Sequence, residues 1–286
     1  MISIVVPVYN KQASIRETLN SILEQKGTDF EIVLVNDGST DSSIDIIKSY
    51  PSDDRLTIIN IENRGVSFAR NVGILNSIGE YIAFIDADDI WHESYLYEML
   101  NLINKYPKAG LYYAQSSICK EELGEYLFKG INTGPVENYY LIVDSLPILT
   151  SCTIVSRRCF NEVGMFNPQY SHGEDLDMWK RIVQSYEIVV NNRILTFYNS
   201  SKTIERASNK TPDIRNKFAY HIRLNKVSNR FERDFWFRHM YGTLSIYLRD
   251  GKFQYVLLFL IKHFRFAPKL VFYKFVQKRK IQLNQK

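Results

Sequence analysis

Three carboxylates that follow a short apolar segment constrain this chain more than any other feature of its sequence. The segment from Tyr81 to Ile85 is rich in aromatic and β-branched residues, which predicts a buried strand. Asp86, Asp88 and Asp89 come directly after it. Open α/β sheets bind their ligands just beyond the carboxyl ends of such strands. We therefore expect these three aspartates at the mouth of a ligand crevice.

Asp86 and Asp88 are spaced to contact one divalent cation or the phosphate groups that such a cation binds. Carboxylates this close repel each other unless positive charge lies between them, and hard cations such as Mg²⁺ prefer oxygen ligands. A solvated acidic turn at the end of a strand would have the same composition. The motif alone leaves both interpretations open, so other motifs have to separate them.

The first 110 residues alternate between strand-like and helix-like segments. Such alternation predicts an α/β fold with a mostly parallel central sheet and helices on both of its faces. The carboxyl ends of parallel strands meet at one edge, so the polar residues after each strand are expected to form one pocket. The expected strands are 2–9, 31–35, 56–61 and 81–85, and the expected helices are 15–23, a segment ending at 47, and 66–78.

The polar residues near these strand ends predict a nucleoside diphosphate as the ligand. Tyr9 offers a ring for stacking, Asp37 a carboxylate for a base or ribose, and Arg70 a cation. No G-x-G-x-x-G follows the first strand and no G-x-x-x-x-G-K-[ST] occurs, which argues against a dinucleotide-binding fold and a P-loop. A nucleoside diphosphate with a divalent metal would use the ring, the cation and the aspartate pair together.

A second pair of carboxylates opens a later helix. Glu174 and Asp175 precede Leu176, Trp179 and Val183, which have helical spacing. The free N–H groups at a helix start stabilise carboxylates, so a capping role is one interpretation of the pair. Further strands are expected at 111–114, 148–155, 187–190 and 194–198.

Five motifs occur in an order and spacing that resemble the inverting family 2 glycosyltransferases of GT-A fold. The resemblance covers about residues 1 to 200. It implies that the N-terminal half binds a nucleotide-sugar, commonly a UDP-sugar, with Mg²⁺ or Mn²⁺. The later half would bind the acceptor and supply the catalytic base. The motifs are Val6-Pro7-Val8-Tyr9-Asn10, Asn36-Asp37-Gly38-Ser39-Thr40-Asp41, Asn63-Arg64-Gly65 with Ala69-Arg70-Asn71, Asp86-Ala87-Asp88-Asp89 and Gly173-Glu174-Asp175.

Carried over by position, the resemblance assigns nucleotide-binding residues. Pro7 and Tyr9 would flank the nucleobase, and Asp37 would hydrogen-bond its edge. Arg70 and Asn71 would face the nucleotide. Simpler alternatives are an ordinary strand-end aromatic at Tyr9, turn chemistry at Asp37 and a solvated side chain at Arg70.

The same resemblance assigns a metal site and a catalytic base. Asp86 would contact the ribose or the metal shell, and Asp88 would bind Mg²⁺ or Mn²⁺ itself. A departing nucleoside diphosphate gains negative charge, which a cation on its phosphate oxygens stabilises. Asp175 would take the proton of the attacking hydroxyl, with Glu174 as a supporting contact.

One departure from the family pattern concerns the metal. Members often have a histidine or a basic loop after the closing strands that contacts the metal or the diphosphate. Residues 199–209 of this chain contain Lys202 and Arg206 but no histidine. A third metal contact, and strict dependence on metal, therefore stay open at this point.

The C-terminal part of the chain differs from the rest in charge. Residues 215–286 contain 17 Lys/Arg and 3 Asp/Glu, net +14, whereas residues 1–214 contain 19 and 28, net −9. This tail also holds 16 of the 39 aromatic residues. Basic amphipathic helices suit an anionic membrane surface, although packing on the catalytic domain or on a second subunit of a homodimer is an alternative. Nucleic acid is not expected, since no nucleic-acid-binding motif accompanies the charge.

Length and composition fit an intracellular enzyme. Three cysteines are too few for a disulfide framework, no signal peptide is recognised at Met1, and the longest apolar run of the tail is shorter than a membrane span. We expect a GT-A catalytic domain at 1–210, divided into a nucleotide-sugar half at 1–110 and an acceptor and base half at 111–210. A helical extension follows at 211–286.

The predicted protein is a cytoplasmic glycosyltransferase, with peripheral attachment to the inner face of the cell membrane as an option. Its partners would be a nucleotide-sugar donor and a glycan or lipid-linked acceptor in polysaccharide or glycolipid synthesis. One alternative is a sugar nucleotidyltransferase, which usually has a Gly-rich, Arg-containing loop where this chain has Pro7-Val8-Tyr9-Asn10. The other is a non-catalytic nucleotide-sugar or membrane scaffold of the same fold, against which the presence of both Asp88 and Asp175 argues.

Overall fold

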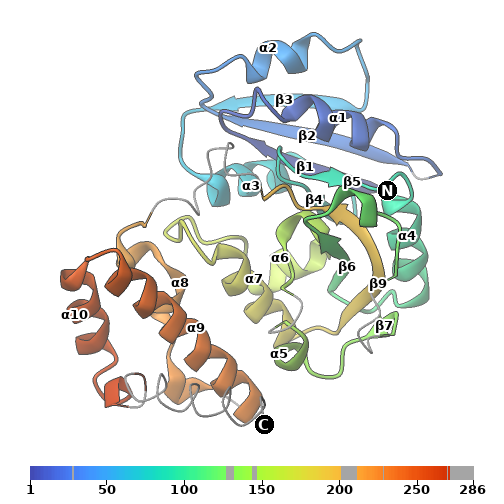
Figure 1. Ribbon diagram of the computed structural model, residues 1–286. Helices are drawn as coiled ribbons and strands as arrows, with labels where there is room; N and C mark the ends of the chain where they lie inside the picture. Colours follow the sequence, from blue (N-terminus) through green and yellow to red (C-terminus); the bar gives the residue numbers. More distant parts are fainter. Residues whose placement is uncertain are drawn as a thin grey trace. The chain divides into compact units, whose positions relative to one another are not determined.

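The computed structural model describes residues 1–27, 29–126, 132–143, 147–200, 211–227, 229–268 and 270. The chain forms two compact units, each of which is considered by itself (Figure 1). The first comprises residues 1–169 and 174–205, and the second comprises 170–173 and 206–286. The expected domain boundary between 210 and 211 adjoins residues 201–210, which lie outside the described residues.

The first unit is built on one large mixed sheet. Its described strands follow the order β3-β2-β1-β4-β8-β6-β9-β5, and β7 pairs with β9 (Figure 1). Their bounds are β1 Ile2–Val8, β2 Phe30–Asp37, β3 Leu56–Ile61, β4 Tyr81–Phe84, β5 Ile90–Trp91, β6 Leu111–Ser117, β7 Gly134–Pro135, β8 Thr153–Ser156 and β9 Ile188–Phe197.

The N-terminal half of this sheet has the predicted parallel arrangement. Strand β1 pairs in parallel with β2 and β4, and β2 pairs in parallel with β3. Helix α3 (Val66–Leu75) packs on the face that carries Val33 and Val35. Helices α1 (Ile15–Leu23), α2 (Ser43–Lys48) and α4 (Tyr95–Lys105) contribute to the larger core on the opposite face. The expectation of helices on both faces is confirmed.

Close packing of α3 on β1 depends on a glycine. A Cβ atom added to Gly73 would lie 2.3 Å from Val5 Cγ1, far inside van der Waals contact. The missing side chain therefore lets the helix approach the central strand. Because α3 also carries Arg70, this approach sets the depth of the guanidinium below the carboxyl end of the sheet.

The second half of the sheet departs from a simple parallel pattern. Strand β8 lies antiparallel between β4 and β6, and β9 is parallel to β6. The expected strand at 148–155 is shorter, because residues Thr150–Cys152 form the 3₁₀ helix η2 before β8 begins. The two expected closing strands form one strand, β9, whose pairing with β6 shifts register around Gln115. The helices are η1 (Lys120–Glu122), α5 (Tyr139–Ile142), α6 (Arg157–Val163) and α7 (Glu174–Val183).

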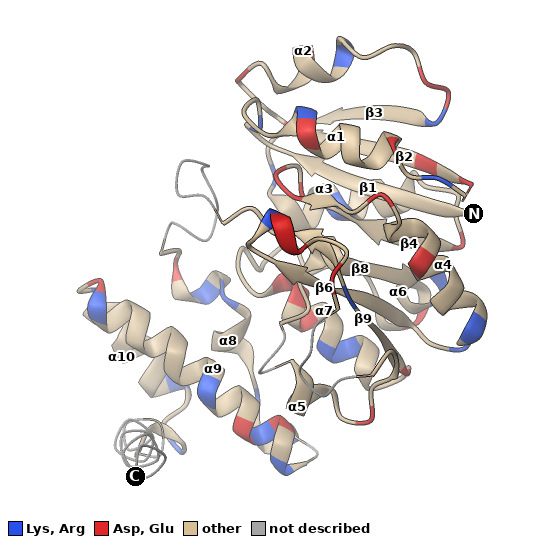
Figure 2. Ribbon diagram, turned by 45° about the vertical axis from the view of Figure 1, so that its right-hand side comes forward, with Lys and Arg blue, Asp and Glu red and all other residues tan. Residues whose placement is uncertain are grey.

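The second unit is helical in its described residues. Asn229 caps α9 by accepting a hydrogen bond from the Glu232 N–H at 2.8 Å, and Gly251 separates α9 from α10 with a φ of +67°. Figure 2 shows Lys and Arg along α9 in blue. The elements are η4 (Ile214–Asn216), α8 (Phe218–His221), η5 (Leu224–Lys226), α9 (Arg230–Arg249) and α10 (Phe253–Lys262). Among the described helices, none has the length and apolar character to cross a bilayer.

Candidate active site

The segments that follow β1, β2 and β4 converge with the start of α7 in the first unit. Lys11 follows β1, Asp37 ends β2, and Asp86 and Asp88 follow β4. Glu174 is the first residue of α7. The structure therefore brings most of the residues expected to act together to the carboxyl edge of the parallel strands, where open α/β folds bind ligands.

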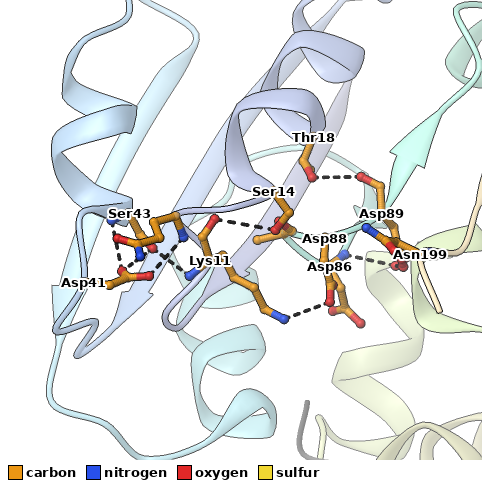
Figure 3. A network of polar contacts seen from close by, with 12 residues as sticks. Lys11, Ser14, Thr18, Asp41, Ser43, Asp86, Asp88, Asp89 and Asn199 are labelled. Carbon is orange, nitrogen blue, oxygen red and sulfur yellow. Dashed lines mark hydrogen bonds and ion pairs between the residues drawn. The ribbon is translucent and has the colours of Figure 1, made fainter. Parts of the chain in front are cut away.

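Hydrogen bonds fasten the loop after β1 to the loop after β2, and Figure 3 shows the one that the N–H of Lys11 donates to Ser43 Oγ at 2.7 Å. The N–H of Asn10 donates to Ser39 Oγ at 3.1 Å, and the N–H of Thr40 donates to Asn10 Oδ1 at 2.8 Å. Asn10 has a φ of +51°, a left-handed conformation that asparagine tolerates better than most residues. The loop that carries the exposed ring of Tyr9 is thus held in one conformation, while Pro7 is buried in β1.

The Asp37 carboxylate organises the third loop of the site. Its Oδ1 accepts a hydrogen bond from the N–H of Arg64 at 2.8 Å, and its Oδ2 accepts one from the N–H of Gly65 at 2.9 Å. Gly38 has a φ of +71°, and a Cβ there would lie 2.8 Å from the Asn63 nitrogen. Both partners of the Asp37 carboxylate lie in the loop after β3 and not in the turn that Asp37 itself enters, so these hydrogen bonds are not the local turn chemistry considered as an alternative for Asp37. Each oxygen keeps a second lone pair, so recognition of a base edge stays a prediction.

Arg70 links the end of β4 to the start of α7. Its guanidinium is buried and forms ion pairs with Asp86 Oδ1 at 2.8 Å and Glu174 Oε1 at 3.0 Å. Burial alone would lower the pKa of Arg70, but the two carboxylates outweigh it and raise the pKa. A solvated role for Arg70 is excluded by its burial. The guanidinium holds both acidic motifs in place.

Asn71 has a positioning role in the structure. Its side-chain amide donates to the Phe166 carbonyl oxygen at 2.8 Å, and its Oδ1 accepts from the Phe166 N–H at 3.0 Å. Phe166 lies 5.4 Å below the Arg70 guanidinium carbon, measured to the ring centroid. Asn71 therefore fixes the segment on which Arg70 rests. Its contact with a nucleotide stays a prediction.

The three aspartates after β4 lie in different environments. Asp86 has 34% of its side chain exposed, and Asp88 is buried with its Oδ2 2.8 Å from Lys11 Nζ (Figure 3). Asp89 is fully buried and accepts hydrogen bonds from Ser151 Oγ at 2.5 Å and from the Asn199 N–H at 3.1 Å. The expectation that Asp89 lies at the crevice mouth is wrong, because its side chain ties β4 to η2 and to the end of β9.

The environment of Asp89 favours its neutral form. Burial, and after it the charges of Asp86 and Asp88, raise the pKa of Asp89 to about 8. The hydrogen bonds from Ser151 and Asn199 oppose this rise. A neutral carboxyl group at Asp89 reduces the repulsion that Asp86 and Asp88 experience, which leaves these two as the anionic pair of the motif.

Asp175 follows Glu174 in the first turn of α7 and is partly buried. Burial raises the pKa of Asp175, and the neighbouring Glu174 carboxylate raises it further. A hydrogen bond from the Leu176 N–H and the charge of Arg70 act in the opposite direction. Because Asp86 also contributes to the shift, the metal-type aspartates and the predicted base share one electrostatic site. A carboxylate with a raised pKa is suited to accept a proton near neutral pH.

The residues that the structure describes supply two carboxylates of a possible metal site and no third protein ligand. Among the described residues, no group of three or more His, Cys, Asp or Glu side chains is arranged to hold a metal ion. Asp86 and Asp88 provide two carboxylates, and the Lys11 ammonium already contacts one of them. Lys202 and Arg206, which were considered at the sequence level, lie outside the described residues. A hard cation at this pair would take its remaining ligands from phosphate oxygens and water.

Sequence reasoning missed two contributors to the site. Lys11 follows the Pro7-Val8-Tyr9-Asn10 motif directly, so its place beside the ligand crevice could have been inferred, but its partner Asp88 is 77 residues away. Ser151 accepts a hydrogen bond from the Asp86 N–H at 3.0 Å and donates to Asp89. No local sequence signal distinguishes this serine from other polar residues near strands.

The chain is similar in sequence to a known protein family and to several of its members. The model of the family Glycosyl transferase family 2 matches residues 3–163. An uncharacterized glycosyltransferase of Rickettsia bellii (strain RML369-C) is 30% identical over 181 residues, which cover 62% of this chain and 26% of the relative. Glycosyltransferase GlyA of Streptococcus pneumoniae serotype 4 is 42% identical over 106 residues, which cover 37% of this chain and 15% of that protein. The chain thus spans well under half the length of these relatives.

Solved structures share the fold of the chain. S. aureus TarS 1-349 in complex with UDP-GlcNAc has a TM-score of 0.61 at 21% identity, covering 95% of this chain and 74% of that chain. The mannosyltransferase PcManGT from Pyrobaculum calidifontis, in complex with GDP-Man and Mn²⁺, has a TM-score of 0.60 at 17% identity, covering 93% and 75%. At these identities the likeness shows a GT-A fold.

Replacing Arg70 should damage stability more than replacing an exposed arginine. In an Arg70→Ala variant, Glu174 and Asp86 lose their shared partner, and we expect the free energy of unfolding to fall by about 3 kcal/mol. The matched control is Arg16→Ala, on the exposed side of α1. This variant should change the free energy of unfolding by less than about 0.5 kcal/mol. Urea unfolding of both variants measures the difference, and equal losses would contradict the central role of Arg70.

Asp89 should make stability depend on pH. Its pKa rises from 3.8 to about 8 on folding, so the folded chain binds the proton more tightly and the free energy of unfolding falls as pH rises through this range. An Asp89→Asn variant lacks this contribution, so its urea midpoint should decline less than that of the wild type between about pH 5 and about pH 9. Asp234→Asn, an exposed position on α9, should follow the wild type. Parallel declines in all three proteins would rule out a buried titration at Asp89.

Proposed function

The chain belongs to glycosyl transferase family 2 and is a glycosyltransferase, and from this premise we propose that it transfers a sugar from a UDP-sugar to a hydroxyl acceptor with inversion. The observation that carries the proposal is the ion-pair cluster in which Arg70 joins Asp86 to Glu174. This cluster fixes a predicted leaving-group site and a predicted base relative to each other. A single displacement requires the metal, the anomeric carbon and the base to be held in line with one another.

The donor site lies on the loops after β1 and β2. The exposed ring of Tyr9 would stack on the base beside Pro7, and Asp37 would accept a hydrogen bond from the base edge. Arg70 lies close behind Asp86 and would contribute positive charge, with Asn71 supporting it. The fold of TarS in complex with UDP-GlcNAc supports a nucleotide-sugar donor, and the UDP moiety is our choice among nucleotides.

The proposed cofactor is Mg²⁺ or Mn²⁺, held by Asp88 and Asp86. The donor set fits such an ion because it consists of hard carboxylate oxygens, and Asp88 already attracts the Lys11 ammonium. A bound metal would stabilise the negative charge that develops on the departing diphosphate. A GT-A neighbour, PcManGT, is described in complex with GDP-Man and Mn²⁺, which supports this choice.

Asp175 is the proposed base. Glu174 is engaged by Arg70, whereas the raised pKa of Asp175 makes it the better proton acceptor of the pair. As the acceptor hydroxyl oxygen bonds to the anomeric carbon, the bond from that carbon to the diphosphate oxygen breaks on the opposite face. The hydroxyl proton passes to the Asp175 carboxylate, and the electron pair leaves with the diphosphate. The configuration at the anomeric carbon is inverted.

The acceptor is proposed to be a glycan or a lipid-linked sugar in cell-surface polysaccharide or glycolipid synthesis, reached from the cytoplasmic side of the membrane. The acidic catalytic part and the basic tail support this placement, because anionic lipids attract only the latter. A homodimer stays a prediction. Of the two alternatives, the sugar nucleotidyltransferase is set aside because the matched family consists of glycosyltransferases.

The Asp175→Asn variant tests the base. We expect kcat for transfer to fall by about 10³-fold, because the variant side chain cannot accept the hydroxyl proton, while the Kd for UDP changes by less than about threefold. Asp177→Asn is the matched control on the same helix, since its carboxylate pairs with Arg181 at 2.9 Å. Initial rates with UDP-sugar panels and calorimetric titration of UDP provide both readouts. Loss of UDP binding equal to the loss of rate would place Asp175 in the donor site instead.

Metal removal and Lys11 together test the proposed cation site. Excess EDTA should abolish transfer, and Mn²⁺ should restore it. In a Lys11→Met variant the metal no longer competes with an ammonium ion for Asp88, so the Kd for Mn²⁺ in the presence of UDP should fall by about fivefold. The exposed Lys26→Met variant should leave this Kd unchanged. Full transfer in EDTA would exclude the metal role of Asp88.

A further inference from the structure

Helix α10 of the second unit presents an apolar face that the described residues leave uncovered. Its inward side consists of Val256 and Phe259, which are buried. Five other apolar side chains of α10 and of the turn after it are exposed. This apolar stripe comprises Phe253 (67% exposed), Leu257 (60%), Leu258 (40%), Ile261 (61%) and Phe264 (67%).

The sequence of α10 is apolar on both sides of the helix, so both sides are expected to be buried. Residues 255–261 are apolar without interruption, so every face of the helix is hydrophobic. A helix of this kind is normally buried all round, and a contiguous exposed apolar surface marks an interaction site. Among the described residues, the packed side of α10 is the one with Val256 and Phe259, together with Tyr255, whose ring lies 5.6 Å from that of Tyr247. The described residues of the unit leave the outward side without a cover.

The charges around the apolar stripe have one sign. From Gly251 to Lys286 the sequence contains nine Lys/Arg and no Asp/Glu. Within the described part, Lys262 and Arg265 are exposed close to Ile261 and Phe264. The Arg265 guanidinium carbon lies 5.8 Å from the centroid of the Phe264 ring. A partner that binds the apolar stripe must therefore combine an apolar interior with a negatively charged surface.

We propose that α10 docks the second unit on an anionic membrane surface. With ten residues, α10 is about half as long as a helix that spans a bilayer, so it would lie in the plane of the interface. The apolar stripe would enter the boundary between headgroups and acyl chains, and Lys262 and Arg265 would contact anionic headgroups. Phe253 and Phe264 mark the two ends of the stripe, where aromatic rings settle at headgroup depth.

A second copy of the chain is a poorer occupant. A twofold contact between two α10 helices would pair the same surface with itself, so two surfaces that each carry Lys262 and Arg265 would be brought together. Like charges in such a contact repel, and the sequence from Gly251 onward has no acidic residue to compensate them. The membrane supplies both missing properties, the apolar interior and the negative charge.

This inference rests on the proposed function only for the reason why the protein would bind a membrane. A lipid-linked acceptor has its sugar at the membrane surface, so docking raises its concentration near the enzyme. The docking surface itself is argued from exposure and charge. It can therefore be tested without reference to transfer.

The experiment uses the full chain and vesicles of two compositions. Sedimentation with vesicles of phosphatidylcholine and phosphatidylglycerol should pellet the protein. Vesicles of phosphatidylcholine alone should bind it at least about tenfold more weakly, because Lys262 and Arg265 then have no anionic headgroups to contact. A Leu257→Ser, Ile261→Ser double variant should lose about tenfold or more in partitioning to anionic vesicles. Arg265→Glu should weaken binding to the anionic vesicles only.

The matched control replaces an equivalent exposed pair elsewhere. Leu75 and Ile78 are 68% and 76% exposed in the first unit, so a Leu75→Ser, Ile78→Ser double variant removes the same side chains outside the apolar stripe. It should bind vesicles like the wild type. Circular dichroism and urea unfolding confirm that each variant is folded before its binding is compared.

Two results would overturn the proposal. One is vesicle binding that is the same for the α10 double variant and for the wild type. The other is a vesicle-free dimer, seen by analytical ultracentrifugation, that the α10 double variant dissociates, which would assign the apolar stripe to a second copy. Hydrolysis of the UDP-sugar by the α10 double variant should match the wild type. If the wild type does not hydrolyse the UDP-sugar, this result counts against the proposed function but does not affect the conclusion about membrane docking.

Discussion

The buried guanidinium of Arg70 is the interaction on which the active site depends. It forms ion pairs with Asp86 after β4 and with Glu174 at the start of α7, which are 88 residues apart in the sequence. Buried ion pairs contribute little net stability, because desolvation offsets the attraction, but removal of one partner is costly. Arg70 therefore acts less as a source of stability than as a constraint on geometry. It permits a cluster of acidic groups to persist where a folded chain would otherwise avoid them.

The acidic groups of this cluster differ in burial and in the partners that they contact. Asp89 is pushed toward its neutral form, and Asp86 and Asp88 remain as the anionic pair beside the Lys11 ammonium. On α7, Glu174 is committed to Arg70 while the pKa of Asp175 rises. Neighbouring carboxyl groups thus lie in different environments because their partners differ. In the proposed mechanism, this arrangement separates cation binding from proton acceptance within one site.

The sequence predicted those features that depend on local pattern. Alternating apolar segments indicated the parallel strands β1 to β4, and polar residues at their ends indicated a shared edge, both of which the structure contains. It did not predict that β8 lies antiparallel between β4 and β6, because strand order depends on packing between distant segments. The interior position of Asp89 and the engagement of Asp37 with backbone N–H groups were missed for the same reason. Their partners, Ser151, Asn199, Arg64 and Gly65, are defined only by the fold.

The two parts of the chain divide opposite electrostatic tasks. A site built from aspartates and glutamates leaves residues 1–214 with net charge −9, which an anionic membrane would repel. If the acceptor is lipid-linked, as we propose, an enzyme of that charge requires a separate source of attraction to the membrane. Residues 215–286, with net charge +14, would supply it, and the apolar stripe on α10 would add a contact that salt does not screen. In this proposal the acidity of the site and the basicity of the membrane-binding surface are compatible in one chain because different parts of the sequence carry them.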